Sequence, residues 1–416
     1  MDSFRDELRR ATGETSRGEQ TLPGVVVIAG NKDGPIFHET FGFQSLDPSS
    51  PPVSKENTFW IASCTKLITA IAVLQIVERG KVDLDEDVTK IIPEWKDQEV
   101  LLGFDEAGKP IVKKMEEKMT LRHCLTHTAG MSYQYDMNLP ISKYKRAMGL
   151  PDTSASHLTL AERTLYPLLS EPETAWEYSP GMDWAGVVVE RLSSQRLEEY
   201  MSENIFKPLG MNSTTFRIND RVDVKEKLID PVTREYSDPT VPGKLKPFTE
   251  YSLTGSYSYD AGGSGLYLPP SDYAKVLQAL LRNDGTLLKP ETVEILLKPQ
   301  LSPELVKSFV DNARSKPTAG LRAAISMNIL EVEETGMNFD SGVNWAFGGL
   351  LTLEDVPGRR KKRSLAWGGM ANLQWVDPTS NVYGMYATQL LPIGDMPSAV
   401  MQSRFEKAVY EELELK

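Results

Sequence analysis

Patterns typical of β-strands occupy the two ends of this chain, whereas helical patterns fill its middle. Near the N-terminus, the β-branched residues 24–30 and residues 36–41 flank the turn sequence Asn31-Lys32-Asp33-Gly34, which predicts an antiparallel hairpin. Strand patterns return near the C-terminus, at residues 346–353, 363–367, 373–377 and 382–389. If the two ends pair, these strands join one antiparallel sheet, and the helical middle becomes a lobe inserted into an α/β body.

This order of elements predicts the domain organisation. A chain of 416 residues can bury a large core, and we expect a single α/β (α+β) domain over residues 1–416, an antiparallel sheet flanked by helices. Its α/β part covers approximately residues 1–85 and 265–416, and its helical lobe approximately residues 86–264. We expect a small-molecule site in the cleft between these two parts.

One predicted helix is apolar around most of its circumference. It covers residues 63–79, which marks it as a buried helix, and Gly80 ends it. Further helices are predicted at residues 3–14, 120–125, 184–192, 271–282, 290–297 and 398–413. Residues 219–259 are polar and contain several prolines, so we expect a long irregular excursion there.

Composition and charge exclude several classes of function. The formal net charge is −12, and the one basic run, residues 359–363, is predicted to form a solvated turn between strands. Nucleic acid is therefore not an expected partner. Two cysteines cannot supply a disulfide scaffold. The charged N-terminus does not resemble a signal peptide, and no run of about 18 apolar residues could span a membrane. We expect a cytoplasmic protein, a monomer or weak oligomer, without a membrane partner.

The first candidate for chemistry is Ser63, which opens the buried helix in the sequence Ser63-Cys64-Thr65-Lys66. Positions i and i+3 share a helix face, so the Lys66 amine can reach the Ser63 hydroxyl. A serine hydroxyl becomes a good nucleophile only when a nearby base takes its proton. Burial at a helix start could keep a lysine partly neutral for that task. By itself the spacing is common, and a helix-capping serine beside a surface lysine is the plainer interpretation.

Two further segments supply the missing parts of an acyl-transfer site. Tyr178 stands in a turn before a helix, where its phenol can point into the cleft and pass protons to and from the nucleophile. Residues 366–370 (AWGGM) end a late strand, and their glycines allow a ligand to approach the backbone. The N–H groups of Met370 and Ser63 can then bind a developing oxyanion. Taken singly, a packing tyrosine and a bulged strand edge are the plainer interpretations.

Other constellations carry less chemistry. His123 and His127 stand at i, i+4, but no glutamate follows His123 and no third metal ligand is evident, so we predict that they anchor a loop. A Ser-His-Asp hydrolase would need a G-x-S-x-G elbow, which the sequence lacks. Cys64 points about 100° away from Ser63 around the helix and is predicted to pack in the core. Arg163 either faces the cleft entrance or lies on a solvated helix face.

In this order and spacing, the three segments resemble class C β-lactamase-type serine hydrolases, in the branch that holds EstB-type esterases and fungal lovastatin-type acyltransferases. Residues 121–131 (LRHCLTHTAGM) resemble the family's L-L-x-H-x-S-G-L stretch, and residues 262–267 (GGSGLY) resemble its G-G-G-L-x-S segment. The similarity runs from about Pro23 to the last helix. It implies a β-lactamase/penicillin-binding-protein-like fold, with Ser63 as nucleophile and Lys66 and Tyr178 as its base system.

The chain departs from the family pattern at two positions. Pro180 stands where the family's Y-x-N motif often has asparagine, and Trp367 stands where β-lactamases and penicillin-binding proteins have a lysine that helps to bind the β-lactam carboxylate. An indole there favours uncharged substrates and offers them an apolar wall. The candidate oxyanion and substrate-binding residues are Met370, Gly369, Trp367, Arg163 and Trp60.

The resemblance implies a serine acyltransferase, transesterase or esterase that acts on neutral small-molecule esters or thioesters in fungal secondary metabolism. The expected partners are an acyl donor, either free or bound to a carrier protein, and an alcohol or water as acceptor, with no cofactor and no metal. Two alternatives stay open: a β-lactamase or other amide hydrolase of the same superfamily, and a catalytically silent binding or scaffold protein of this fold. The motifs serve hydrolysis and transfer equally.

Overall fold

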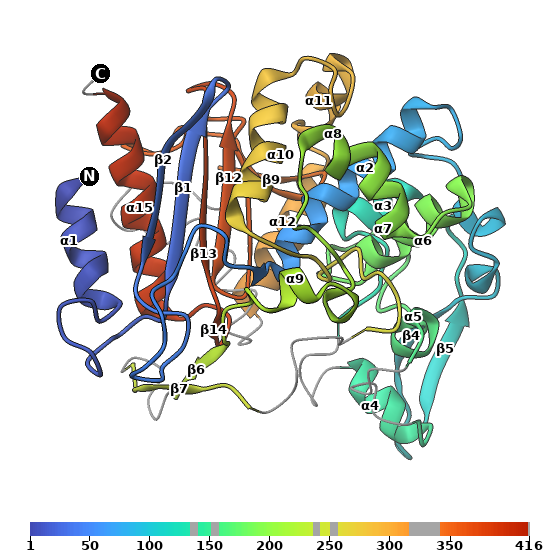
Figure 1. Ribbon diagram of the computed structural model, residues 1–416. Coiled ribbons are helices and arrows are strands. Elements are labelled where there is room, and N and C mark those ends of the chain that lie inside the picture. Colours follow the sequence, from blue (N-terminus) through green and yellow to red (C-terminus); the bar gives the residue numbers. More distant parts are fainter. Residues whose placement is uncertain (134–139, 151–157, 236–241, 250–256, 316–341, 415–416) are drawn as a thin grey trace.

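A seven-stranded sheet is the main element of the computed structural model. The structure describes residues 1–133, 140–150, 158–235, 242–249, 257–315 and 342–414. Its strands are β1 (Val25–Asn31), β2 (Gly34–Phe41), β9 (Val343–Ala346), β10 (Gly349–Thr352), β11 (Leu365–Gly369), β12 (Asn372–Asp377) and β13 (Val382–Thr388). The strand order is β2-β1-β13-β12-β11-β10-β9, and each neighbouring pair is antiparallel. Val25 of β1 faces Thr388 of β13, so the two ends of the chain do pair, as predicted (Figure 1).

Helices cover both faces of this sheet (Figure 1). On one face lie α1 (Asp2–Ala11) and α15 (Met396–Glu414), and the ring of Phe405 lies 5.5 Å from the rings of both Phe4 and Trp375. On the other face, α10 (Pro270–Arg282) packs against β1 and β13. The other α-helices of at least four residues in the described ranges are α2 (Thr65–Glu78), α3 (Leu121–Thr126), α4 (Pro140–Ala147), α5 (Leu160–Thr164), α6 (Gly181–Ser193), α7 (Leu197–Met201), α9 (Val222–Lys225), α11 (Pro290–Leu296) and α12 (Pro303–Ser315).

The helix α2 runs through the core, as its apolar sequence predicts. All its residues from Thr65 to Ile76 are buried. The turn between β9 and β10 presses on the start of this helix, because a Cβ at Gly348 would lie 2.8 Å from the Cα of Leu67. Gly348 also has a positive φ of +91°, which glycine adopts without strain. The single strand predicted at residues 346–353 is therefore wrong: two strands meet there at a glycine turn that packs on α2.

Several short elements depend on contacts between distant segments, and local patterns did not predict them. The predicted excursion at residues 219–259 contains β6 (Val232–Arg234), which pairs in parallel with β14 (Leu390–Leu391) and antiparallel with β7 (Leu245–Pro247). The largely helical middle also contains a hairpin of β4 (Glu99–Phe104) and β5 (Pro110–Lys114). The division into an α/β part and a helical lobe at the boundaries given above stays a prediction.

The basic run at residues 359–363 is not the solvated turn that its composition predicts. Arg359 and Arg360 are 2% and 1% exposed, and both bind the buried carboxylate of Glu406 on α15. Burial alone would raise the pKa of Glu406, but the two guanidinium groups outweigh burial and lower it to about 2. The later part of the run is exposed to solvent, as predicted. Arg363, for example, is half-exposed and pairs with Glu294.

Replacing Glu406 by glutamine should destabilise the fold by roughly 3–5 kcal/mol, because it leaves two buried cations without their anion. A carboxyl whose pKa is lowered in the folded state stabilises that state above its ordinary pKa of 4.5. That contribution, about 3 kcal/mol for a folded pKa of about 2, disappears as the pH falls from 4.5 towards 2. Urea unfolding at pH 7 and pH 3 should therefore show a smaller pH effect in Glu406→Gln than in the wild type. Glu294→Gln is the exposed control and should cost less than about 1 kcal/mol; an equal loss in both variants contradicts the role of burial.

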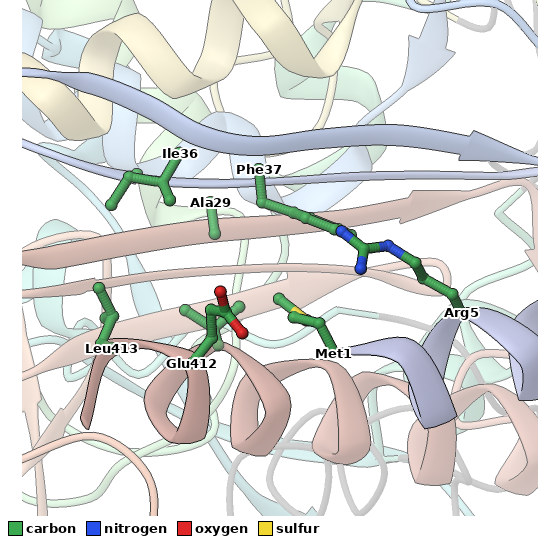
Figure 2. Close-up of a pocket in the computed structure, with 9 residues that line it drawn as sticks. Met1, Arg5, Ala29, Ile36, Phe37, Glu412 and Leu413 are labelled. Atoms are coloured by element: carbon green, nitrogen blue, oxygen red, sulfur yellow. The ribbon is translucent and has the colours of Figure 1, made fainter. Parts of the chain in front are cut away.

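A small cavity lies between the terminal helices and the sheet (Figure 2). Its volume is about 70 Å³, well below the roughly 300 Å³ at which ligand pockets begin. The side chains around it come from α1, α15 and the first hairpin, and they include Met1, Arg5, Ala29, Ile36, Phe37, Glu412 and Leu413. None of the residues that line it belongs to the three predicted catalytic segments, so the candidate site lies elsewhere. Within the described ranges, no helix is long and apolar enough to cross a membrane.

Candidate active site

Ser63 lies in a tight turn between a short strand and the buried helix. The strand β3 (Phe59–Trp60) leads into a 3₁₀ turn at Ala62–Cys64, and α2 follows directly. Ala62 has a positive φ of +43°, a strained conformation for a residue with a side chain. Surrounding side chains hold this turn: Tyr273 Oη donates to the carbonyl of Cys64 at 2.8 Å, and Asn372 Nδ2 donates to that of Trp60 at 3.1 Å. The strained turn presents the Ser63 hydroxyl at the start of α2.

Lys66 reaches the Ser63 hydroxyl, as the i, i+3 spacing predicts. Its Nζ lies 3.2 Å from Ser63 Oγ and donates to the carbonyl of Gly263 at 2.8 Å. The Lys66 side chain is fully buried in the first turn of α2. The amine is therefore held in one place by two oxygens, one of which is the candidate nucleophile.

Tyr178 contacts the same hydroxyl from a segment far along the chain. Its Oη lies 2.8 Å from Ser63 Oγ, and its ring centroid lies 4.6 Å from Lys66 Nζ. Tyr178 belongs to the loop that leads into α6, so helices far apart in the sequence bring these groups together. The three residues that the sequence analysis singled out for catalysis therefore form one hydrogen-bonded cluster.

Trp367 contributes differently from its predicted role as an apolar wall. Its side chain is only 1% exposed, so it offers almost no surface to a substrate. Instead, its indole Nε1 donates a hydrogen bond to Tyr178 Oη at 3.1 Å, and its ring packs edge-on against Trp345 at 4.6 Å. Trp367 thus places a neutral N–H donor, rather than a cation, beside the phenol oxygen.

His127 anchors the loop that carries Tyr178. Its sequence position predicts that it anchors a loop, but not which loop. The backbone N–H of Ser179 donates to His127 Nδ1 at 3.2 Å, and the imidazole lies 4.6 Å from the Tyr178 ring. Burial lowers the pKa of His127 well below its usual range, and the positive charge of Lys66 lowers it further. A neutral ring whose Nδ1 is free to accept suits this hydrogen bond. His127 lies within the LRHCLTHTAGM stretch, but its contact with Tyr178 left no signal in the sequence.

The end of β11 approaches the amide of the candidate nucleophile. A Cβ at Gly369 would lie 2.3 Å from the backbone nitrogen of Ser63, so only glycine allows this approach. Met370 follows in the turn to β12 with a positive φ of +53°, and its buried side chain packs with Ala62. The turn carrying Met370 and the backbone of Ser63 are therefore neighbours, as an oxyanion site at these two residues requires.

Trp60 and Arg163 lie in the layer outside this cluster. The indole Nε1 of Trp60 donates to the carbonyl of Ser264 at 2.6 Å, and Ser264 Oγ donates to Tyr257 Oη at 3.1 Å. The guanidinium of Arg163, on α5, lies over the Tyr257 ring at 5.1 Å from its centroid. Arg163 is thus connected to the site through Tyr257 and Ser264, and no direct contact with Ser63 is observed among the described interactions.

Two further features bear on the chemistry of the site, namely the state of the Cys64 thiol and the grouping of side chains that could bind a metal. Cys64 is fully buried, as predicted, and burial raises the pKa of its thiol to about 12. In the part of the chain that the structure describes, His, Cys, Asp and Glu side chains nowhere gather in a group of three or more that could hold a metal ion. Ser63, Lys66 and Tyr178 are the side chains whose hydrogen bonds meet at one oxygen, Ser63 Oγ.

Comparison with known proteins connects this geometry to a family. The chain is 33% identical over 404 residues to the ML-236A carboxylate methylbutanoyltransferase of Penicillium citrinum, covering 94% of this chain and 91% of the relative. It is 34% identical over 398 residues to the lovastatin esterase of Penicillium rubens, covering 94% of each. A mutant of the simvastatin synthase from Aspergillus terreus has a similar structure, with a TM-score of 0.84 and 32% identity over 99% of this chain and 95% of that one.

The first relative is named as an acyltransferase and the second as an esterase, and the third shares the fold, so the prediction of an acyl-transferring enzyme with a β-lactamase-like fold is confirmed. The sequence model of the Beta-lactamase family matches residues 8–402, nearly the whole chain. The long match, the identity to these relatives and the shared architecture agree with one another. The chain belongs to the Beta-lactamase family.

Proposed function

We propose that Ser63 accepts an acyl group from a neutral ester or thioester and passes it to an alcohol or to water. The observation that carries this proposal is the position of Ser63 Oγ, 2.8 Å from Tyr178 Oη and 3.2 Å from Lys66 Nζ. A hydroxyl held between two groups that can exchange protons is the arrangement that nucleophilic catalysis by serine needs.

The proposed reaction has two symmetrical halves. In the first, the proton of Ser63 moves to the Lys66–Tyr178 pair while Oγ bonds to the acyl carbon, and the N–H groups of Ser63 and Met370 hold the oxyanion. The bond from the acyl carbon to the donor's oxygen or sulfur then breaks, and the pair returns its proton to that leaving group. In the second half, the acceptor gives up its proton to the same pair while its oxygen bonds to the acyl carbon. The bond from the acyl carbon to Ser63 Oγ then breaks, and the pair returns the proton to Ser63 Oγ.

Several observations support neutral substrates. A buried carboxylate needs a cation as partner, and the side chain beside Tyr178 Oη is the uncharged indole of Trp367. The relatives' names describe transfer of a methylbutanoyl group and hydrolysis of lovastatin. We therefore propose a short branched acyl group as the transferred unit and a hydroxyl of a small fungal secondary metabolite as its acceptor. The donor is a small molecule or a thioester on a carrier protein.

The residues outside the catalytic cluster are proposed to bind the rest of the substrate. Trp60 packs beside Met370 and Ala62 and is held by Ser264, which places an aromatic edge next to the nucleophile. Arg163 and Tyr257 form the next layer outwards. With Gly369 keeping the strand end close to Ser63, this surface would receive the acyl donor. The cytoplasmic location and the monomeric or weakly oligomeric state stay predictions.

The substrate class is tested by kcat/KM for p-nitrophenyl butyrate and nitrocefin on the same preparation. We expect kcat/KM to be at least about 100-fold higher for the neutral ester. Each CH₂ of its acyl chain that becomes buried contributes roughly 0.8 kcal/mol, whereas the indole at position 367 is uncharged and cannot pair with the carboxylate of nitrocefin. Adding a small alcohol should divert the acyl group from water and yield the transferred ester. A preference for nitrocefin would make the protein a β-lactamase, and inertness towards both substrates would favour a silent scaffold.

A further inference from the structure

A single residue bridges a buried carboxylate and the proposed base system. Asp183, in the first turn of α6, is 5% exposed. Its Oδ1 accepts a hydrogen bond from the backbone N–H of Gly263 at 3.0 Å, and its Oδ2 accepts one from Tyr133 Oη at 3.3 Å. The carbonyl of the same Gly263 accepts the hydrogen bond from Lys66 Nζ at 2.8 Å. A single glycine therefore joins Asp183 on its amide side to Lys66 on its carbonyl side.

The turn that carries this glycine is shaped to fit between the two helices. A Cβ at Gly263 would lie 2.6 Å from Asp183 Oδ2 and 2.7 Å from Tyr133 Oη. A Cβ at Gly262 would lie 2.9 Å from the carbonyl of Met182, and the Gly262 carbonyl accepts a hydrogen bond from Thr69 Oγ1 at 2.7 Å. Any larger residue would push the turn away from Asp183. The close packing explains why two glycines stand at these positions.

The charges in this region are complementary. Lys66 is fully buried, and a buried ammonium is costly unless a nearby anion balances it. Asp183 accepts two hydrogen bonds through different oxygens, as an ionised carboxylate does, and the N-terminal end of α6 favours negative charge. Burial has the largest effect and raises the pKa of Asp183 above its ordinary value, whereas the charge of Lys66 and the hydrogen bonds from Gly263 and Tyr133 oppose this rise. Asp183 and Lys66 therefore stabilise each other's charged form.

The other titratable groups near this pair are neutral in their usual forms. The phenols of Tyr133 and Tyr259 face Asp183, and burial raises the pKa of Tyr259. Among the described residues, the groups that face Lys66 are the rings of Tyr178 and Tyr133, at 4.6 Å and 5.4 Å from its Nζ, the thiol of Cys64 and the neutral ring of His127. Asp183 thus supplies the negative charge on this side of the base system.

We propose that Asp183 is a positioning residue for Lys66, which it holds through the Gly262-Gly263 turn and whose positive charge it balances. This role rests on the proposed function of Ser63. Lys66 and Tyr178 share a proton, either as amine and phenol or as ammonium and phenolate. An anion beside Lys66 favours the second state, in which Tyr178 takes the proton of Ser63. Asp183 therefore acts on the reaction without touching the substrate.

The test is the pH dependence of the acylation rate, measured as the burst with p-nitrophenyl butyrate between about pH 5 and pH 9. Asp183→Asn keeps an oxygen that can accept from Gly263 but removes the charge. Protonation of the Lys66–Tyr178 pair then becomes harder, so the acid limb should move to lower pH by about half to one unit, and the plateau rate should fall by about 10-fold or more. Asp183→Ser removes the same charge with a smaller side chain and should show the same shift if asparagine disturbs the fold.

Tyr133→Phe is the matched control, because it removes a hydrogen bond to Asp183 and leaves the carboxylate. Its acid limb should stay at the wild-type pH. An unmoved limb in the folded neutral variants, or an equal shift in Tyr133→Phe, overturns the role of Asp183. Intact-mass analysis of the wild type separates the two proposals: an enzyme that acylates Ser63 but shows no shift contradicts only Asp183, whereas a wild type that is never acylated contradicts the proposed function.

Discussion

Ser63→Ala is expected to lower the turnover of p-nitrophenyl butyrate by at least about 10³-fold, and to leave the protein folded. The hydroxyl oxygen is the atom that Tyr178 Oη and Lys66 Nζ both contact, so its removal leaves the proton-transfer groups without a nucleophile. The change deletes one oxygen from a half-buried side chain, and unfolding in urea should differ from the wild type by less than about 1 kcal/mol. Steady-state rates and urea unfolding on the same preparation give both quantities.

The control for this variant is Ser264→Ala. Ser264 is another serine near the site, but its hydroxyl contacts Tyr257 rather than the base system. This variant should keep its turnover within about 10-fold of the wild type, because no proton-transfer group loses its partner. Near-wild-type turnover in Ser63→Ala, or loss of turnover in Ser264→Ala alone, contradicts the assignment of the nucleophile.

Lys66→Met and Tyr178→Phe should each lower the acylation rate by about 10³-fold or more, and the double variant should be little slower than either one. Both groups contact the same oxygen and lie 4.6 Å apart from amine to ring centroid, so they exchange protons with Ser63 as one unit. Methionine keeps the length of the buried Lys66 side chain, and phenylalanine keeps the ring that packs on His127. Burst kinetics of the two single variants and the double variant complete the cycle.

Two outcomes of this cycle would contradict the shared unit. A double variant whose loss equals the product of the single losses would show that the two groups act independently. A Tyr178→Phe variant with wild-type acylation would leave Lys66 alone as the base. Urea unfolding of each variant serves as the control, since a fully buried Lys66 also balances the charge of Asp183.

The sequence predicted those parts of the site that depend on local geometry. Ser63 and Lys66 are three residues apart at the start of one helix, and helical geometry alone brings their side chains together. Tyr178 and Met370 are candidates from their own segments, a turn before a helix and a glycine-rich strand end. No local rule connects them with Ser63, so their connection with it depends on the family resemblance. The pairing of the two chain ends followed from the positions of the strand patterns.

The parts that the sequence did not predict depend on contacts between segments far apart in the chain. The hydrogen bond from Trp367 to Tyr178 joins a residue of β11 to one in the loop before α6. The sequence alone predicts that the Trp367 indole faces the substrate. Asp183 looks like an ordinary helix residue, and His127 like a general loop anchor, until the fold places them beside Lys66 and Tyr178. The basic run was assigned to solvent because its anion, Glu406, lies about 46 residues further along the chain, on α15.

The central claim is that an acyl group rests on Ser63, and intact-mass analysis followed by peptide mapping tests it most directly. The protein is mixed with a short-chain acyl thioester, quenched in acid and weighed, and then digested to locate the added mass. We expect the wild type and Ser264→Ala to gain one acyl group on the peptide that contains Ser63, and Ser63→Ala to gain none. Adding an acceptor alcohol should remove the acyl mass from the wild type and yield the corresponding ester. An acyl group on any other residue, or an unlabelled wild type that still turns over the thioester, would contradict the account.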